Sequence, residues 1–142
     1  KLNKNLVLLY TGQQRTAQLI AKKFVKKLTN QKKNEIIELL QCVKESKNII
    51  RNNKPNDFGR LLNESWMIKK RLDKSISNST IDDMYNLALK NGALGGKILG
   101  AGGGGFLLFY VNDFKKKYFL DKMKFLTNVP FEFENNGTQI IS

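Results

Sequence analysis

The chain contains no histidine and a single cysteine, Cys42, among its 142 residues. With neither histidine nor a second thiol, it can build no zinc site on nitrogen and sulfur ligands and no Ser/His or Cys/His nucleophile pair. A lone cysteine also excludes an internal disulfide. We therefore expect a cytoplasmic protein in which Cys42 serves as a small apolar residue of a helix.

Long apolar runs are missing as well. No stretch of the sequence approaches the length that spans a bilayer, and no signal-like apolar segment follows Lys1. We expect no membrane partner. Because the chain begins without methionine, we also expect it to be a piece of a longer protein.

Acidic residues are scarce: 12 Asp and Glu face 25 Lys and Arg, which gives a net charge of +13. A net charge of this size is typical of proteins that bind nucleic acid. The lysines, however, are spread over several segments and mixed with Asn and Gln, without the interleaved aromatic residues of a single-strand binder. We expect a solvated basic surface and no nucleic acid. A positive field of this kind also concentrates phosphorylated substrates.

Glycine is concentrated in one place, since eight of the eleven glycines lie between Gly92 and Val111. Six consecutive small residues, Gly100, Ala101, Gly102, Gly103, Gly104 and Gly105, follow the short apolar run Lys97–Leu99 and precede the apolar run Phe106–Val111. This pattern predicts strand, loop, strand. Successive N–H groups in such a loop form a concavity that suits phosphate, so the six residues and Lys97 are candidate nucleotide-binding residues.

Two familiar phosphate motifs do not fit this glycine segment. Gly100, Gly102 and Gly105 match G-x-G-x-x-G, but that fingerprint opens a helix and here a strand follows. A P-loop needs Ser or Thr after Gly-Lys, and Gly96-Lys97 is followed by Ile98. A tight hairpin that binds nothing remains the alternative.

Hydrophobic periodicity predicts strands at 6–10, 97–99, 106–111, 131–134 and 138–141, the last two joined by a turn at 135–137. It predicts helices at 17–28, 34–50, 56–72, about 80–91 and 114–126. In the second helix we expect an inward stripe of Ile36, Ile37, Leu40, Val43 and Ile50. The last helix has the apolar residues Tyr118, Phe119, Met123 and Leu126. Asn56, and either Ser79 or Thr80, are candidate N-caps. Helices segregated from hairpin-linked strands indicate an α+β sandwich with a mainly antiparallel sheet and helices over one face.

Three residues outside the glycine segment are candidates for substrate binding. Arg15 follows the first strand at a turn into a helix, where a guanidinium can fork onto a phosphate or simply lie at the surface. Trp66 and Lys69 lie within one helical turn, so a ring could stack on a sugar with an ammonium group toward its phosphate. A core tryptophan with solvated lysines is the alternative.

The stretch Gly-Ala-Leu-Gly-Gly-Lys-Ile-Leu-Gly-Ala-Gly-Gly-Gly-Gly-Phe from Gly92 to Phe106 resembles the third glycine motif of the GHMP small-molecule kinases. Segments 10–15, 63–70 and 129–134, with Gly137 and Gln139, are similar to the branch of that family that phosphorylates D-glycero-D-manno-heptose 7-phosphate at its anomeric oxygen. The resemblance extends over nearly the whole chain.

The resemblance implies that residues 1–142 are the C-terminal, ferredoxin-like domain of an ATP- and Mg²⁺-dependent sugar-phosphate kinase. The N-terminal domain, absent here, would carry the phosphate-cradling loop and the catalytic Asp, so we expect no catalytic residue in this chain and no turnover by it alone. Its partners would be that domain and a small sugar phosphate. A kinase of the same family acting on another alcohol or sugar, and a non-catalytic regulatory or interaction domain, remain as alternatives.

Overall fold

The computed structural model describes residues 2–13, 32–134 and 137. Along the chain these form α1 (Leu2–Asn5), β1 (Leu6–Tyr10), α3 (Lys33–Arg51), α4 (Pro55–Leu72), a 3-10 turn (Lys74–Ile76), α5 (Ser79–Lys90), β2 (Ala93–Ile98), β3 (Phe106–Val111), α6 (Asp113–Lys122) and β4 (Thr127–Asn128). The expected helix at 17–28 and the expected last strand at 138–141 lie outside the described residues.

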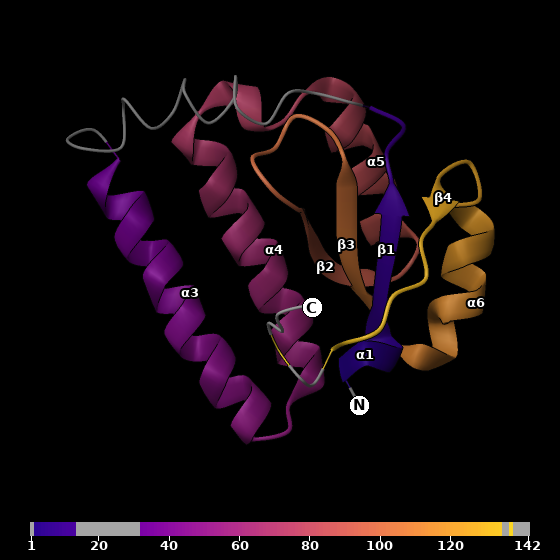
Figure 1. Cartoon of the computed structure of the whole chain (residues 1–142), viewed down its shortest axis with the longest axis horizontal. Helices are drawn as coiled ribbons and strands as arrows, with labels where there is room; N and C mark the ends of the chain where they lie inside the picture. The colour runs from indigo at the N-terminus through magenta and orange to yellow at the C-terminus, as the bar shows by residue number, and fades with distance from the viewer. Residues whose placement is uncertain (1, 14–31, 135–136, 138–142) are drawn as a thin grey trace, which may run out of the picture.

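The strands form one antiparallel sheet in the order β2-β3-β1-β4 (Figure 1). The two long neighbours pair in register from Leu6 with Tyr110 to Tyr10 with Phe106. Because alternate residues of a strand point to opposite faces, Val7, Leu9, Leu107, Phe109 and Val111 share one face. The α+β fold with a mainly antiparallel sheet is confirmed.

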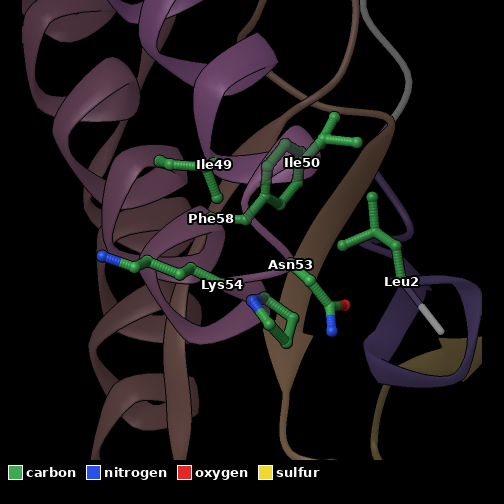
Figure 2. Close-up of a pocket in the computed structure, with 7 residues that line it drawn as sticks. Leu2, Ile49, Ile50, Asn53, Lys54 and Phe58 are labelled. Carbon is green, nitrogen blue, oxygen red and sulfur yellow. The ribbon is translucent and has the colours of Figure 1, made fainter.

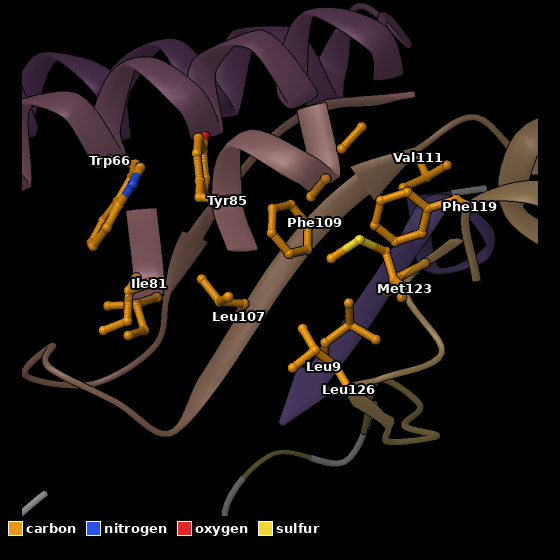
Figure 3. Packing of buried hydrophobic residues seen from close by; sticks show 14 of the residues in the cluster. Leu9, Trp66, Ile81, Tyr85, Leu107, Phe109, Val111, Phe119, Met123 and Leu126 are labelled. Carbon is orange, nitrogen blue, oxygen red and sulfur yellow. The ribbon is translucent and has the colours of Figure 1, made fainter. Parts of the chain in front are cut away.

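That face carries the main core. The strand residues pack with Ile81, Tyr85 and Ala88 of α5, with Phe119 and Met123 of α6, and with Trp66 and Leu72 of α4. Four rings follow one another through it, with centroid separations of 6.0 Å for Trp66 and Tyr85, 5.6 Å for Tyr85 and Phe109, and 5.8 Å for Phe109 and Phe119 (Figure 3). Helices thus cover this face of the sheet, as expected.

Helix α3 packs through a different stripe from the expected one. Its buried residues are Cys42 and Ile49, which meet Leu61 and Ile68 of α4 in a second, smaller cluster. Four of the five residues predicted to face inward are exposed instead: Ile37, Leu40, Val43 and Ile50. Apolar residues occupy both sides of this helix, and only the stripe that meets α4 is covered by the described residues.

The expected helix starts are corrected by one or two residues. Pro55 begins α4, where its missing N–H costs nothing, so Asn56 is not a cap and its Oδ1 accepts a hydrogen bond from the Tyr110 hydroxyl. The cap of α5 is Asn78, whose Oδ1 accepts from the Ile81 N–H at 3.0 Å. At 131–134 the structure has no strand; the chain instead pairs with β1 through β4.

The start of β2 lies close against the middle of α4. A methyl group added at Gly95 would come within 2.0 Å of the Gly59 carbonyl oxygen. Beyond that contact, the Tyr85 hydroxyl donates to Asn63 Oδ1 at 2.8 Å and accepts from the Gly96 N–H at 3.2 Å. Helices α4 and α5 are therefore both fixed to the strand that leads into the glycine segment.

Candidate functional site

Residues 100–105 form the loop between β2 and β3, as the sequence predicts. The expected strand at 97–99 is corrected, because β2 begins at Ala93 and ends at Ile98. At its base the Leu99 N–H donates to the Phe106 carbonyl at 2.8 Å, which closes the hairpin. The loop is far wider than a two-residue turn, and Gly102 has φ +104, a conformation that residues with a Cβ rarely adopt. Local sequence thus explains the shape of the loop.

Two other segments hold the loop in place. The Gly103 N–H donates to the carbonyl of Ile76, in the 3-10 turn before α5, at 2.8 Å. The Gly105 N–H donates to the Gln13 carbonyl at 2.9 Å, and the Thr11 side chain donates to the Gly105 carbonyl at 2.9 Å. Added Cβ atoms at Gly102 and Gly104 would lie 2.7 Å from the Ile76 and Gln13 carbonyl oxygens respectively. These glycines permit close approach to neighbouring backbone.

The other amides of the loop have no partner among the described residues. The N–H groups of Gly100, Ala101, Gly102 and Gly104 donate no hydrogen bond within 2–13, 32–134 and 137. Successive backbone N–H groups that are not used internally form an anion-binding concavity. The loop is therefore held by two of its amides and leaves others for an acceptor from outside.

Lys69 and Lys97 lie beside this loop. Lys69, on the last turns of α4, donates from Nζ to the Gly100 carbonyl at 2.5 Å. Partial burial and the nearby charge of Lys97 lower the pKa of Lys69 to about 8. Two ammonium groups that repel each other are relieved by an anion between them. The structure thus brings together Lys69, Lys97 and Gly100, which sequence reasoning had placed on two different sides of the site.

Lys97 comes from β2, and its side chain also lines a hollow of about 370 Å³ between α3 and α4. Leu39, Val43, Phe58 and Leu62 are among the apolar residues that share this lining. The hollow connects the lysine to an apolar surface and offers no carboxylate partner. Lys97 is paired with no acidic side chain of the described residues.

Trp66 does not face a ligand. Its side chain is fully buried in the main core, which corrects the stacking role considered for it and agrees with the alternative of a core tryptophan. The indole nitrogen has no hydrogen-bond partner among the described residues. Arg15, the other candidate on the substrate side, lies outside the described residues.

Sequence reasoning missed the residues that hold the loop. Thr11 and Gln13 reach it because Tyr10 pairs with Phe106, a register that no local pattern reveals. The Gln13 side chain in turn accepts from the Asn78 amide at 3.2 Å. The end of β1, the start of α5 and the glycine loop therefore meet at one end of the sheet.

The donors at this site suit the phosphate groups of ATP: backbone N–H groups and two ammonium groups, with no acidic side chain hydrogen-bonded to either lysine. Mg²⁺ requires oxygen ligands such as carboxylates. No cluster of three or more carboxylate, thiol or imidazole groups occurs in the part of the chain that the structure describes. The described residues thus fit nucleotide phosphates.

A second hollow lies at the other end of α4, where α3 turns into α4 (Figure 2). It has a volume of about 460 Å³ and is lined by Leu2, Ile49, Ile50, Asn53, Lys54, Pro55 and Phe58. Fifteen residues of helix separate Lys54 from Lys69, or about 22 Å at 1.5 Å per residue. This apolar hollow is therefore separate from the glycine loop.

None of the helices in the described part of the chain is long and apolar enough to cross a bilayer.

Comparison with known proteins places this geometry in a family. Residues 43–123 match the family model described as GHMP kinases C terminal. D-glycero-alpha-D-manno-heptose 7-phosphate kinase of Campylobacter jejuni is 46% identical over 63 residues, which are 42% of this chain and 19% of that protein. The bifunctional fucokinase/GDP-fucose pyrophosphorylase of Arabidopsis thaliana is 29% identical over 120 residues, 82% of this chain and 11% of that protein.

The fold agrees with solved kinases. L. major mevalonate kinase, solved in complex with R-mevalonate, superposes with a TM-score of 0.73 at 18% identity, over 84% of this chain and 37% of that one. The chain spans less than a fifth of the length of the two curated relatives above. The family match covers more than half of this chain and includes the glycine loop, Lys69 and Lys97, and the chain belongs to the C-terminal domain family of the GHMP kinases.

Proposed function

We propose that this chain is the C-terminal part of an ATP-dependent sugar-phosphate kinase and forms one wall of its active site. The observation that carries the proposal is the glycine loop, with unused N–H groups beside Lys69 and Lys97. The family and the small share of the curated relatives that the chain spans both support a larger protein. The remaining part, with the catalytic Asp and the second phosphate loop, would be the N-terminal domain.

In this proposal the described residues bind and orient, and no acid or base of this chain acts on the substrate. ATP would supply the γ-phosphoryl group, with Mg²⁺ held by groups outside the described residues. The loop amides and the two ammonium groups neutralise phosphate charge, and the absence of side chains on the loop allows close approach. Phosphoryl transfer depends on positioning and charge stabilisation, so a half-site is expected to be inactive.

For the acceptor we propose the anomeric hydroxyl of D-glycero-D-manno-heptose 7-phosphate. The 46% identity with the Campylobacter jejuni enzyme supports this substrate over a limited stretch. A phosphorylated sugar also suits a site with two ammonium groups and a strongly basic chain. In the reaction the bond between the γ-phosphorus and the bridging oxygen of ADP breaks, a bond from that phosphorus to the anomeric oxygen forms, and the hydroxyl proton would pass to the catalytic Asp of the N-terminal domain.

Another sugar is the second candidate, since the fucokinase relative aligns over 82% of this chain. A non-catalytic domain that retains the fold is the third. That the protein is located in the cytoplasm stays a prediction.

A coupled ADP-release assay on the complete natural chain separates these candidates. With Mg·ATP, we expect turnover with heptose 7-phosphate and none with fucose, free hexoses, homoserine or mevalonate. Turnover with fucose alone would show that the protein is a kinase whose acceptor is fucose and not heptose 7-phosphate. If no acceptor caused ADP release, the proposal that the protein is a kinase would be contradicted. Residues 1–142 alone should release no more ADP than a blank without enzyme.

Lys69 makes anion binding sensitive to pH. Because its pKa is lowered to about 8, it loses its proton as the pH rises through that value. If binding requires the charged form, affinity for ATP falls about tenfold between pH 7 and pH 9. Isothermal titration of the complete enzyme at a series of pH values measures this.

Two variants make the titration specific. Lys69→Met should bind ATP more weakly at pH 7 and show a flat profile up to pH 9. Lys74→Met, which removes an exposed lysine of the 3-10 turn, should keep the slope of the unmodified enzyme. An unchanged slope in Lys69→Met would assign the titration to another group.

A further inference from the structure

Helix α6 and the turn after it display aromatic rings to the outside. Phe114 is 80% exposed, Tyr118 is 55% exposed and Phe125 is 56% exposed. The rings of the core, such as Tyr85, Phe109 and Phe119, are covered almost completely. Of the apolar residues of this helix and its turn, Phe119, Met123 and Leu126 lie in the core and Leu120 packs against it, whereas Tyr118 is exposed. Exposed rings need another explanation than packing.

Lysines surround these rings. Lys115, Lys117, Lys122 and Lys124 are all exposed. Lys115 Nζ lies 5.9 Å from the centre of the Phe114 ring, and Lys122 Nζ lies 5.5 Å from the centre of the Tyr118 ring. The expectation that the lysines lack interleaved aromatic residues is therefore wrong for this segment. Asp113 and Asp121 are its carboxylates, so positive charge is in excess.

Phe114 and Tyr118 share the outer face of α6 with lysines and with Asp121, which is about 20° from Phe114 around the helix axis. At 100° per residue, Phe114 and Tyr118 lie about 40° apart around the axis, with Lys115 and Lys122 on one side and Lys117 on the other. Phe119 and Met123 lie on the opposite side, in the core. Figure 1 shows α6 beside β4, at the edge of the sheet opposite to β2 and α4. The face is thus separate from the glycine loop.

Three kinds of partner bear negative charge, and the composition distinguishes them. A single-strand binder tracks the nucleic-acid backbone in a groove, whereas these rings stand on the outside of a helix. Protein interfaces favour Arg and are depleted in Lys, whereas all four exposed cations here are lysines. Exposed aromatic rings can enter the headgroup region of a bilayer, and lysines beside them are attracted to the phosphates of anionic lipids.

We propose that α6 and its following turn dock the protein onto an anionic phospholipid surface. The rings of Phe114, Tyr118 and Phe125 enter the headgroup region, and the lysines beside them lie against the lipid phosphates. The proposed contact is peripheral. The proposal departs from the sequence-based expectation of no membrane partner, and it is independent of the substrate of the kinase.

Vesicle sedimentation of the complete natural chain tests the proposal. We expect pelleting with phosphatidylcholine vesicles that contain a quarter phosphatidylglycerol, little with phosphatidylcholine alone, and release in high salt, which screens the lysines. The double variant Phe114→Ser/Phe125→Ser should lower the partition coefficient about tenfold or more because less apolar surface enters the bilayer. The triple variant Lys115→Gln/Lys117→Gln/Lys122→Gln should lower it similarly.

Matched controls come from elsewhere on the chain. Phe133→Ser removes a ring that is 52% exposed, and Lys44→Gln/Lys47→Gln removes two exposed charges of α3; both should pellet like the unmodified protein. Circular dichroism verifies the fold of each variant. Equal loss in the controls, or no pelleting of the complete chain at low salt, would overturn the proposal. So would tighter binding of a labelled single-stranded oligonucleotide that depends on Phe114, because it would assign the face to nucleic acid.

Discussion

Under the proposed function, Gly102→Ala is expected to lower kcat/KM of the complete natural protein by about 100-fold or more, the scale of loss that follows from a misplacement of about 1 Å at a reacting centre. The added Cβ would lie 2.7 Å from the Ile76 carbonyl oxygen and 2.9 Å from Ile76 Cα. Both are backbone atoms, which cannot move aside as the end of a side chain can. The φ of +104 adds strain for any residue with a Cβ. The loop must therefore shift.

The shift would also break the bond from the Gly103 N–H to the Ile76 carbonyl, one of the two amide contacts that hold the loop. Displaced amides no longer match the phosphate oxygens, so kcat falls together with the affinity for ATP. Steady-state kinetics of the complete enzyme measure both quantities.

Gly12→Ala is the matched control for this variant. Gly12 also has a positive φ, +71, but nothing lies within 4 Å of an added Cβ. It therefore tests strain without collision, and we expect activity within a few-fold of the unmodified enzyme. If Gly102→Ala kept normal kcat and KM, the loop would have no role in positioning, and the proposed function would lose the observation that carries it.

The glycine loop and its flanking strands were predictable because their signals are local. Six small residues between two apolar runs leave few other conformations. The second strand is confirmed by β3, whereas β2 begins at Ala93, earlier than the apolar run indicated. What the loop touches was not predictable. Ile76 and Gln13 contact the loop through their backbone carbonyl groups. Every residue has such a carbonyl, so the residue types at 76 and 13 do not reveal these contacts.

Helix α3 shows a second limit. Its sequence carries apolar residues on two sides, so periodicity identifies a helix without choosing the inward face. The stripe with Cys42 and Ile49 meets α4, while Leu40 and Val43 remain exposed. Only the position of a neighbouring helix decides between such stripes, and that position depends on contacts far apart in the sequence.

Trp66 and Lys69 show why spacing alone misassigns a site. They lie three residues apart on α4, and the sequence allows both to face a ligand. In the structure Trp66 is buried toward α5, whereas Lys69 reaches the Gly100 carbonyl. Three residues leave the two side chains about 60° apart around the helix axis, enough to place one side chain in the core and the other at the edge of the core beside the loop. Lys69 and Lys97 lie near each other because α4 packs against β2.

The close contact between α4 and β2 leads to the largest expected effect on stability. We expect Gly95→Ala to lower the free energy of unfolding by about 3 kcal/mol or more, at the upper end of what overpacking costs. The added Cβ would lie 2.0 Å from the Gly59 carbonyl oxygen and 2.8 Å from the Asn63 backbone nitrogen. Both atoms belong to the backbone of α4, so the whole helix must move away from the strand.

A displaced α4 affects the site as well as the fold, because the same helix carries Lys69 and Asn63, and Asn63 is the partner of the Tyr85 hydroxyl. Thermal unfolding of the complete protein should show a melting temperature lower by about 10 °C, with weaker ATP binding in the folded fraction.

Gly92→Ala is the matched control. Its added Cβ would meet only the flexible Lys115 side chain, at 3.3 Å, so this variant carries the strain of a φ of +106 without a backbone collision. Gly95 itself has no positive φ, so only the collision with α4 is expected to act on Gly95→Ala. A loss of stability in Gly95→Ala no larger than in Gly92→Ala would contradict the requirement for close approach of α4 to β2. A clearly larger loss in Gly95→Ala would support it.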